Sequence, residues 1–169
     1  MPGTSRVEND IAPLVEKANE IWKQGCIRFE LTATSGRNVS AQLANDPYDY
    51  DVKRNESKML EALRAATGDM KGSIELYFVK SFLNVKGATV GSGARSYSGL
   101  GDDADERTVA HEFGHQIGLQ DIRARRNKPL QNVNLMESPG TSRVLVIEQV
   151  REARKVAEKT IENLQKELQ

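Results

Sequence analysis

Residues 111–121 read His-Glu-Phe-Gly-His-Gln-Ile-Gly-Leu-Gln-Asp, and this stretch carries the pattern that decides the fold. His111 and His115 are four positions apart, so on a helix they lie on one face with Cβ atoms roughly 5–6 Å apart. At that separation two imidazole nitrogens can reach one zinc ion at about 2.0–2.1 Å. Glu112 follows the first histidine and projects beside the metal, where a carboxylate can take a proton from zinc-bound water. The stretch therefore predicts a metal-bearing helix with its own general base.

The third protein ligand cannot be a histidine, because the chain has only two. A catalytic zinc usually has three protein ligands and one open position for water. Gly118 permits a sharp turn at the end of the helix, since glycine adopts positive φ at little cost, and the chain can then present Asp121 to the metal. Each residue also has an interpretation that needs no metal: Asp121 could cap the next turn, and an isolated His-Glu-x-x-His also occurs by chance. The presence of both histidines in the motif, followed by a glycine and a carboxylate, favours the zinc site.

The composition is that of an ordinary globular protein, with 38% hydrophobic and 28% charged residues in a chain of 169. This length fits one domain over residues 1–169, in which residues 156–169 either complete the domain or extend its last helix. The 24 basic and 24 acidic residues balance, which argues against broad electrostatic capture of nucleic acid or an anionic membrane. No apolar run approaches the roughly 20 residues that span a bilayer, and the first ten residues lack the core of a secretory signal. The single Cys26 excludes an internal disulfide, and we expect it to be a small core residue.

Apolar periodicity predicts an α+β order of elements. The first helix is expected to begin with a capping box of Ser5 and Glu8 and to end at Gly25. The later elements are a strand over 26–33, a loop over 36–51, a helix over 55–66, a strand over 74–83, an edge strand over 88–97 interrupted by two glycines, a helix over 105–118, irregular chain over 119–140 and a long final helix capped by Thr141 or Ser142.

The eleven residues from His111 resemble the extended His-Glu-x-x-His-x-x-Gly-x-x-His/Asp signature of the metzincin zinc peptidases. The aspartate form is similar to the snapalysin branch, which consists of small secreted bacterial proteases. Met136 matches the methionine of the tight turn that metzincins carry beneath the zinc. The resemblance implies a zincin-like domain, with a twisted mixed sheet, a backing helix and an active-site helix. It also implies a zinc endopeptidase that acts on protein or peptide substrates, with Glu112 as general base and secretion as its expected localisation. We expect the chain to be a monomer.

Two features depart from the family pattern. Metzincins normally have a strand before the backing helix, yet few residues precede that helix here. Some metzincins also place a tyrosine two residues after the methionine, where this chain has Ser138, so no transition-state stabilisation by such a tyrosine is expected. A non-catalytic module that keeps zinc for stability is the competing interpretation. Intact Glu112 argues against it, because structural zinc sites prefer four protein ligands and need no base.

Three acidic residues before the active-site helix have two interpretations. Asp102, Asp103 and Asp105 form an oxygen-rich loop of the kind that suits calcium. Negative charge is also favoured at a helix N-terminus, which explains the same residues more simply.

Overall fold

The computed structural model describes residues 4–36, 52–68, 70–80, 85–123 and 133–169, and it has a mixed α+β architecture. The described elements are the α-helices α1 (Glu8–Trp22), α3 (Val52–Thr67), α4 (Glu106–Gln116) and α5 (Ile147–Glu167), the strands β1 (Glu75–Phe78), β2 (Gly87–Val90) and β3 (Tyr97–Leu100), and the short 3-10 helices η1 (Lys23–Gly25) and η2 (Gly93–Arg95). None of the helices in these ranges is long and apolar enough to cross a membrane.

The three described strands form one small mixed sheet in the order β1-β3-β2. Strand β1 runs parallel to β3, and β2 runs antiparallel to it, with Thr89 opposite Ser98. The strand predicted over 74–83 is confirmed for its first half, and residues 81–84 lie outside the described residues. The edge strand predicted over 88–97 is confirmed for residues 88–90, which belong to β2, whereas the rest of the stretch is not part of that strand. Gly91 and Gly93, with φ of 75° and 76°, reverse the chain and divide the stretch between edge strand β2 and central strand β3.

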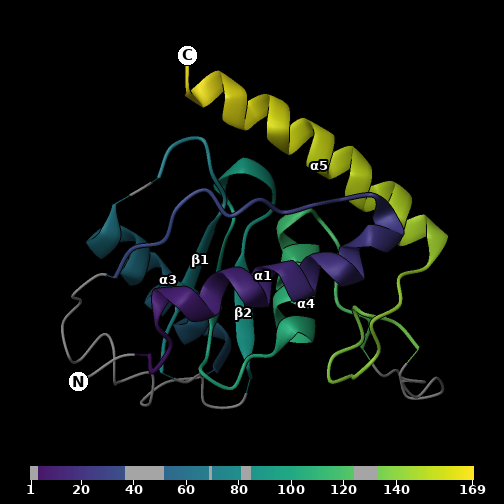
Figure 1. Cartoon of the computed structure of the whole chain (residues 1–169), viewed down its shortest axis with the longest axis horizontal. Coiled ribbons are helices and arrows are strands. Elements are labelled where there is room, and N and C mark those ends of the chain that lie inside the picture. The colour runs from purple at the N-terminus through teal and green to yellow at the C-terminus, as the bar shows by residue number, and fades with distance from the viewer. Residues whose placement is uncertain (1–3, 37–51, 69, 81–84, 124–132) are drawn as a thin grey trace.

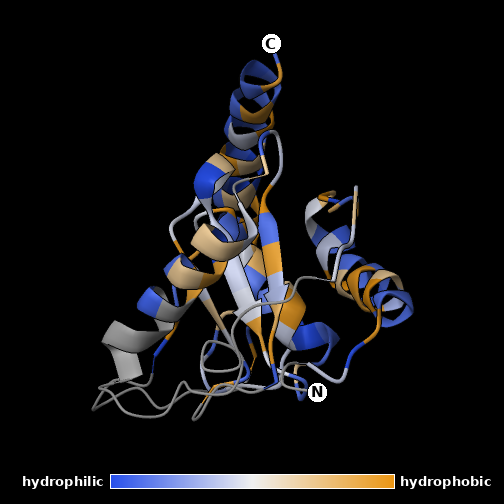
Figure 2. Ribbon diagram, turned by 90° about the vertical axis from the view of Figure 1, so that its left-hand side faces the viewer, coloured by the Kyte–Doolittle hydropathy of each residue, from blue (hydrophilic) through white to orange (hydrophobic). Residues whose placement is uncertain are grey.

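Helices cover both faces of this sheet, as Figures 1 and 2 show. Helix α4 packs on one face against β2 and β3, and α1 packs on α4. The larger hydrophobic core lies in this layer and includes Trp22, Phe113 and Met136. Helix α3 covers the other face, where Leu60 and Tyr97 belong to a smaller core. Strand β3 is buried along its whole length because it lies between these two layers.

The start of α1 differs from the prediction, because Ser5 and Glu8 do not form a capping box. The helix begins at Glu8, and the Asp10 carboxylate accepts a hydrogen bond of 2.9 Å from the Val7 N–H. The Ser5 N–H instead donates to the Asp102 carboxylate at 2.8 Å, which ties the N-terminal arm to the loop before α4. The side chain of the third helical residue therefore caps the start of the helix.

Helix α5 starts in the same way and also corrects a prediction. It begins at Ile147, so Thr141 and Ser142 precede the helix by several residues and do not cap it. The Gln149 side chain accepts a hydrogen bond of 3.2 Å from the Val146 N–H. The helix packs on η1 and η2, and its C-terminal end reaches the loop before β1, where Gly72 N donates to the Glu167 carboxylate at 3.4 Å.

The strand predicted over 26–33 is also wrong. Residues 27–36 are extended but form no sheet pairing within the described part of the chain. Cys26 is exposed and left-handed, with φ of 51°, and is therefore not the core residue that we expected. The segment is held instead by Asn19, whose side-chain amide donates to Phe29 O and accepts from Phe29 N, both at 2.9 Å.

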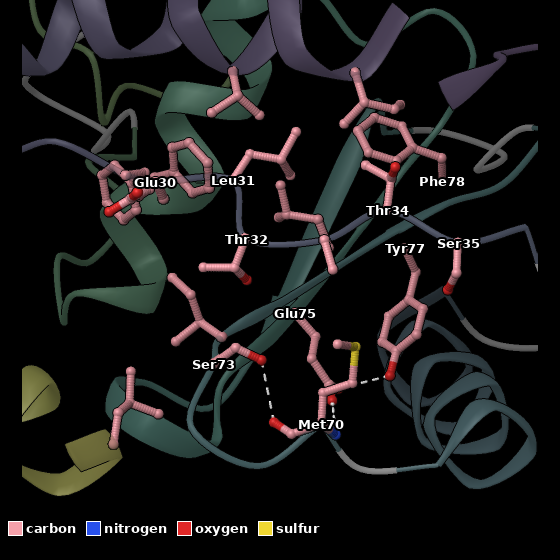
Figure 3. Close-up of a pocket in the computed structure, with 18 of the residues that line it drawn as sticks. Glu30, Leu31, Thr32, Thr34, Ser35, Met70, Ser73, Glu75, Tyr77 and Phe78 are labelled. Atoms are coloured by element: carbon pink, nitrogen blue, oxygen red, sulfur yellow. Dashed lines mark hydrogen bonds between the residues drawn. The ribbon is translucent and has the colours of Figure 1, made fainter. Parts of the chain in front are cut away.

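A cavity of about 1180 Å³ separates this extended segment from strand β1. Figure 3 shows Glu30, Leu31 and Thr32 on one side of it and Ser73 and Glu75 on the other. The two stretches therefore face each other across open space, which explains why the alternating pattern of residues 26–33 does not produce a sheet strand here.

Candidate metal centre

The N-terminus of α4 is fixed by a side-chain cap. Asp105 accepts hydrogen bonds of 2.8 Å from both the N–H and the hydroxyl of Thr108. Burial raises the pKa of Asp105, but these two hydrogen bonds together with nearby basic side chains outweigh it, so the net shift is downward. The Asp102 carboxylate is bound by Thr4 and Ser5. The capping interpretation of this loop is thus confirmed for Asp105, and the calcium interpretation finds no support among the described residues.

One turn further along α4, the two histidines lie side by side as their spacing predicts. The rings of His111 and His115 meet edge to face, with centroids 4.7 Å apart. The His111 ring is buried, whereas the His115 ring is half-buried. Both Nε2 atoms approach the same oxygen, Asp121 Oδ1, at 3.2 Å and 3.3 Å respectively.

The chain brings Asp121 to this position by the turn that Gly118 was expected to make. Gly118 has φ of 89°, and Leu119 N donates to Gly114 O at 2.8 Å to close the end of the helix. Ile122 N then donates to Met136 O at 2.7 Å. Asp121 therefore lies between two backbone anchors, and its side chain is directed back at the histidines.

The other nitrogen of each ring is used to fix the ring. His111 Nδ1 lies 3.0 Å from Leu135 O, and His115 Nδ1 lies 2.8 Å from Leu119 O. A carbonyl oxygen only accepts hydrogen bonds, so each Nδ1 carries a proton and each neutral imidazole presents a lone pair at Nε2. Metal-binding histidines commonly donate their second ring N–H in this way.

Three electron-pair donors, the two Nε2 atoms and Asp121 Oδ1, consequently converge on one point, and a cation bound there would interact favourably with all three. Asp121 Oδ1 is buried and has no hydrogen-bond partner, although the two Nε2 atoms lie close to it. The three ligand atoms lie within 4.8 Å of one another. Ligands at about 2.0–2.2 Å on a tetrahedron are about 3.3–3.6 Å apart, so the two contacts of 3.2 Å and 3.3 Å lie close to two edges of such a site. His111, His115 and Asp121 could therefore hold a metal ion.

The electrostatics of these groups agree with a place for positive charge. The two imidazoles hold the pKa of the Asp121 carboxyl well below its usual range. Burial lowers the pKa of His115, but Asp121, Glu112 and the Leu119 carbonyl together outweigh it, so the net shift is upward. Both shifts mark a point that favours positive charge, which a bound cation would supply in place of a proton while both rings stay neutral.

Glu112 lies on α4 beneath strand β2 and is almost fully buried, with 4% of its surface exposed. Burial raises the pKa of its carboxyl group, against the attraction of His111 and His115. The Thr89 hydroxyl donates to Glu112 Oε2 at 2.6 Å. The carboxylate is therefore held close to the two histidines by an interaction that the local motif does not reveal.

Met136 lies directly under α4 and is completely buried. A Cβ added to Gly114 would lie 2.5 Å from Met136 Sδ, so the helix approaches the methionine as closely as a glycine allows. The Asn134 side chain accepts a hydrogen bond of 2.8 Å from Met136 N. Met136 thus packs against α4 at Gly114, next to His115, while its role as the methionine of a metzincin turn stays a prediction.

Arg107 links the methionine segment, residues 134–137, to His111 and was not among the predicted site residues. It donates to Leu135 O at 2.9 Å and to Glu137 O at 2.8 Å, and Leu135 O is also the partner of the His111 ring. The sequence does offer one signal for it, because Arg107 precedes His111 by four positions and so lies on the same helical face. No local pattern, however, places the Leu135 carbonyl within its reach.

Comparisons with known proteins identify no relative: no family model, no curated protein and no solved structure matches the chain.

Proposed function

We propose that this chain is a zinc-dependent endopeptidase of the metzincin type. The observation that carries the proposal is the convergence of His111, His115 and Asp121 on one point, with the buried carboxylate of Glu112 beside them. The support comes from the order of the motif and from the geometry that its residues adopt.

Zinc is the metal that the donor set suits best. Two imidazole nitrogens and one carboxylate oxygen are ligands typical of zinc, whereas calcium and magnesium prefer oxygen donors alone. The set also provides only three protein ligands, which is typical of catalytic sites that keep a fourth position open. A structural zinc site would usually have four protein ligands.

When bound, zinc would polarise the scissile carbonyl and make a water molecule acidic enough to lose a proton near neutral pH. Glu112 would accept that proton and later return it to the leaving amine. The carbonyl groups of Leu135 and Leu119 would keep the two imidazoles in the tautomer that directs Nε2 at the ligand position. Arg107 would hold the Leu135 carbonyl in place.

An extended substrate would lie along β2. This strand pairs with β3 on one side and forms the edge of the described sheet. An extended peptide can add to such an edge through main-chain hydrogen bonds. Glu112 lies directly beneath β2, so a peptide on this edge would run past the base.

The test combines metal analysis with cleavage of casein and a mixed fluorogenic peptide library. We expect the zinc-loaded chain to cleave these substrates and a chelator to abolish cleavage. Glu112→Gln should lower kcat by more than about 100-fold, since general acid–base catalysis contributes about 10²–10⁴-fold, while zinc binding persists. Glu20→Gln, on the exposed face of α1, is the matched control and should cleave like the wild type.

Two results would contradict the proposal. Undiminished cleavage by Glu112→Gln would exclude the role of the base. A zinc-loaded wild type that cleaves none of these substrates would favour the competing interpretation, a non-catalytic module that retains zinc.

A further inference from the structure

The carboxylate of Glu112 is enclosed by two residues from one face of strand β2. Gly87 and Thr89 are two positions apart, so both direct the same side toward α4. A Cβ added to Gly87 would lie 2.9 Å from both Cγ and Oε1 of Glu112. On the other side, the Thr89 hydroxyl lies 2.6 Å from Oε2. Gly87 thus leaves room for the carboxylate, and Thr89 donates a hydrogen bond to it.

The direction of the Thr89 hydrogen bond follows from a second hydroxyl. Thr89 Oγ1 also lies 2.6 Å from Ser98 Oγ, and these two residues are directly opposite in the β2–β3 ladder. An ionised carboxylate only accepts, so the single proton of Thr89 goes to Glu112 and Ser98 must donate to Thr89. Ser98 is completely buried, which fixes this relay of two hydroxyl groups within the sheet.

We propose that Thr89 is a positioning residue for Glu112, which orients the carboxylate by holding one oxygen and leaving the other to accept a proton. This inference rests on the proposed peptidase function. A threonine suits the task because its branched Cβ restricts χ1, so the hydroxyl has few alternative directions. Since Thr89 belongs to the edge strand, the segment that would bind an extended substrate also sets the position of the base.

A purely structural role is the alternative, in which Thr89 only satisfies a buried carboxylate. The two roles differ in what a substitution changes. Loss of a structural hydrogen bond would lower the unfolding temperature and reduce activity only in proportion to the folded fraction. Loss of a positioning contact would lower kcat in protein that is fully folded and fully loaded with zinc, and leave KM unchanged.

The experiment compares Thr89→Val, which removes only the hydroxyl, with Thr89→Ser, which keeps it. Thr32→Val is the matched control, because Thr32 is exposed and belongs to the segment after α1, not to the strand that contacts Glu112. In the zinc-loaded proteins at a temperature where all are folded, we expect Thr89→Val to lower kcat for the peptide library about 10–100-fold, the lower range of general-base effects. KM and zinc affinity should stay within about threefold of the wild type, and Thr89→Ser should recover most of the loss.

A spectroscopic measurement tests the same contact without any substrate. With cobalt in place of zinc, the visible absorption bands report the geometry around the metal and its open position. We expect Thr89→Val to change these bands in the same direction as Glu112→Gln, while Thr89→Ser and Thr32→Val match the wild type. Wild-type kcat or unchanged bands in Thr89→Val would overturn the inference. If the wild type cleaves nothing but the cobalt bands respond as described, the proposed function fails and the Thr89 contact stands.

Discussion

Residues 111–121 and residues 27–36 both contact the aromatic core around Phe113, but they are held in place by different interactions. In the first stretch, hydrogen bonds fix His111 and His115, and the carboxylate of Asp121 faces both rings. In the second, the ring of Phe29 stacks on Phe113 at a centroid distance of 3.8 Å, and Asn19 binds its backbone. The first stretch has the rigidity that a ligand set needs, whereas the second depends on a few contacts beside an open cavity.

The largest effect should follow from removal of a ligand in the first stretch. Asp121→Asn keeps the shape of the side chain but removes the charge that completes the cluster. Because substitutions of residues that only orient ligands already cost about 10–100-fold in metal affinity, we expect more than 100-fold weaker zinc binding. Titration with a competing chelator would measure it, with the exposed Asp103→Asn as control. Equal affinity in the two variants would exclude Asp121 as a ligand.

The second stretch should be most sensitive at its aromatic stack. Phe29→Ala should lower the free energy of unfolding by about 2–3 kcal/mol, which is less than for a fully buried phenylalanine because this ring is half-buried. Leu31→Ala should cost less than about 1 kcal/mol, since Leu31 is 38% exposed. Urea denaturation would compare them, and equal losses would mean that the stack does not hold the segment.

The close packing of Met136 against α4, beside the candidate metal site, gives a third test. Gly114→Ala places a methyl group against the buried Met136 sulfur, and overpacking of this kind costs about 1–3 kcal/mol, partly offset by the better helix propensity of alanine. We expect a net loss of about 1–2 kcal/mol by thermal denaturation. In Gly36→Ala the new methyl group meets no atom within 4 Å, so this variant should be close to neutral. A neutral Gly114→Ala would show that the helix and Met136 separate easily.

The smallest expected effect concerns the cap that begins α4. Asp105→Ala should cost about 1 kcal/mol at neutral pH, as is typical for loss of an N-cap. The pKa of Asp105 in the folded chain lies below its ordinary value of 3.8, so its contribution is present above that pH and is lost as the pH falls through the folded pKa. The difference between wild type and variant should therefore disappear in acid. A difference that persists at low pH would mean that the charge of Asp105 is not responsible.

The sequence was a good guide where short-range geometry decides the outcome. The spacing of His111 and His115, the turn at Gly118 and the return of Asp121 all follow from helix geometry and the conformational freedom of glycine. The position of Met136 beneath the helix followed from the resemblance to a known family. The central part of the candidate site was therefore predictable from a single sequence.

The sequence was a poor guide where a residue's role depends on a distant partner. The alternation of residues 26–33 indicates a strand, but a strand also needs a neighbour, and this segment faces a cavity. Ser5 has the form of a cap, yet its backbone binds a carboxylate 97 residues away. Thr89 and Arg107 reach the site only because the sheet and the methionine segment pack on α4. No local pattern encodes such contacts.

Metal analysis of the purified chain after exhaustive dialysis tests the central claim most directly. Elemental analysis should find one zinc ion bound per wild-type chain and almost none in His115→Ala. If the wild type retains no zinc, or if His115→Ala retains as much as the wild type, then the convergence of two imidazoles and a carboxylate does not bind the metal and the proposed chemistry is excluded.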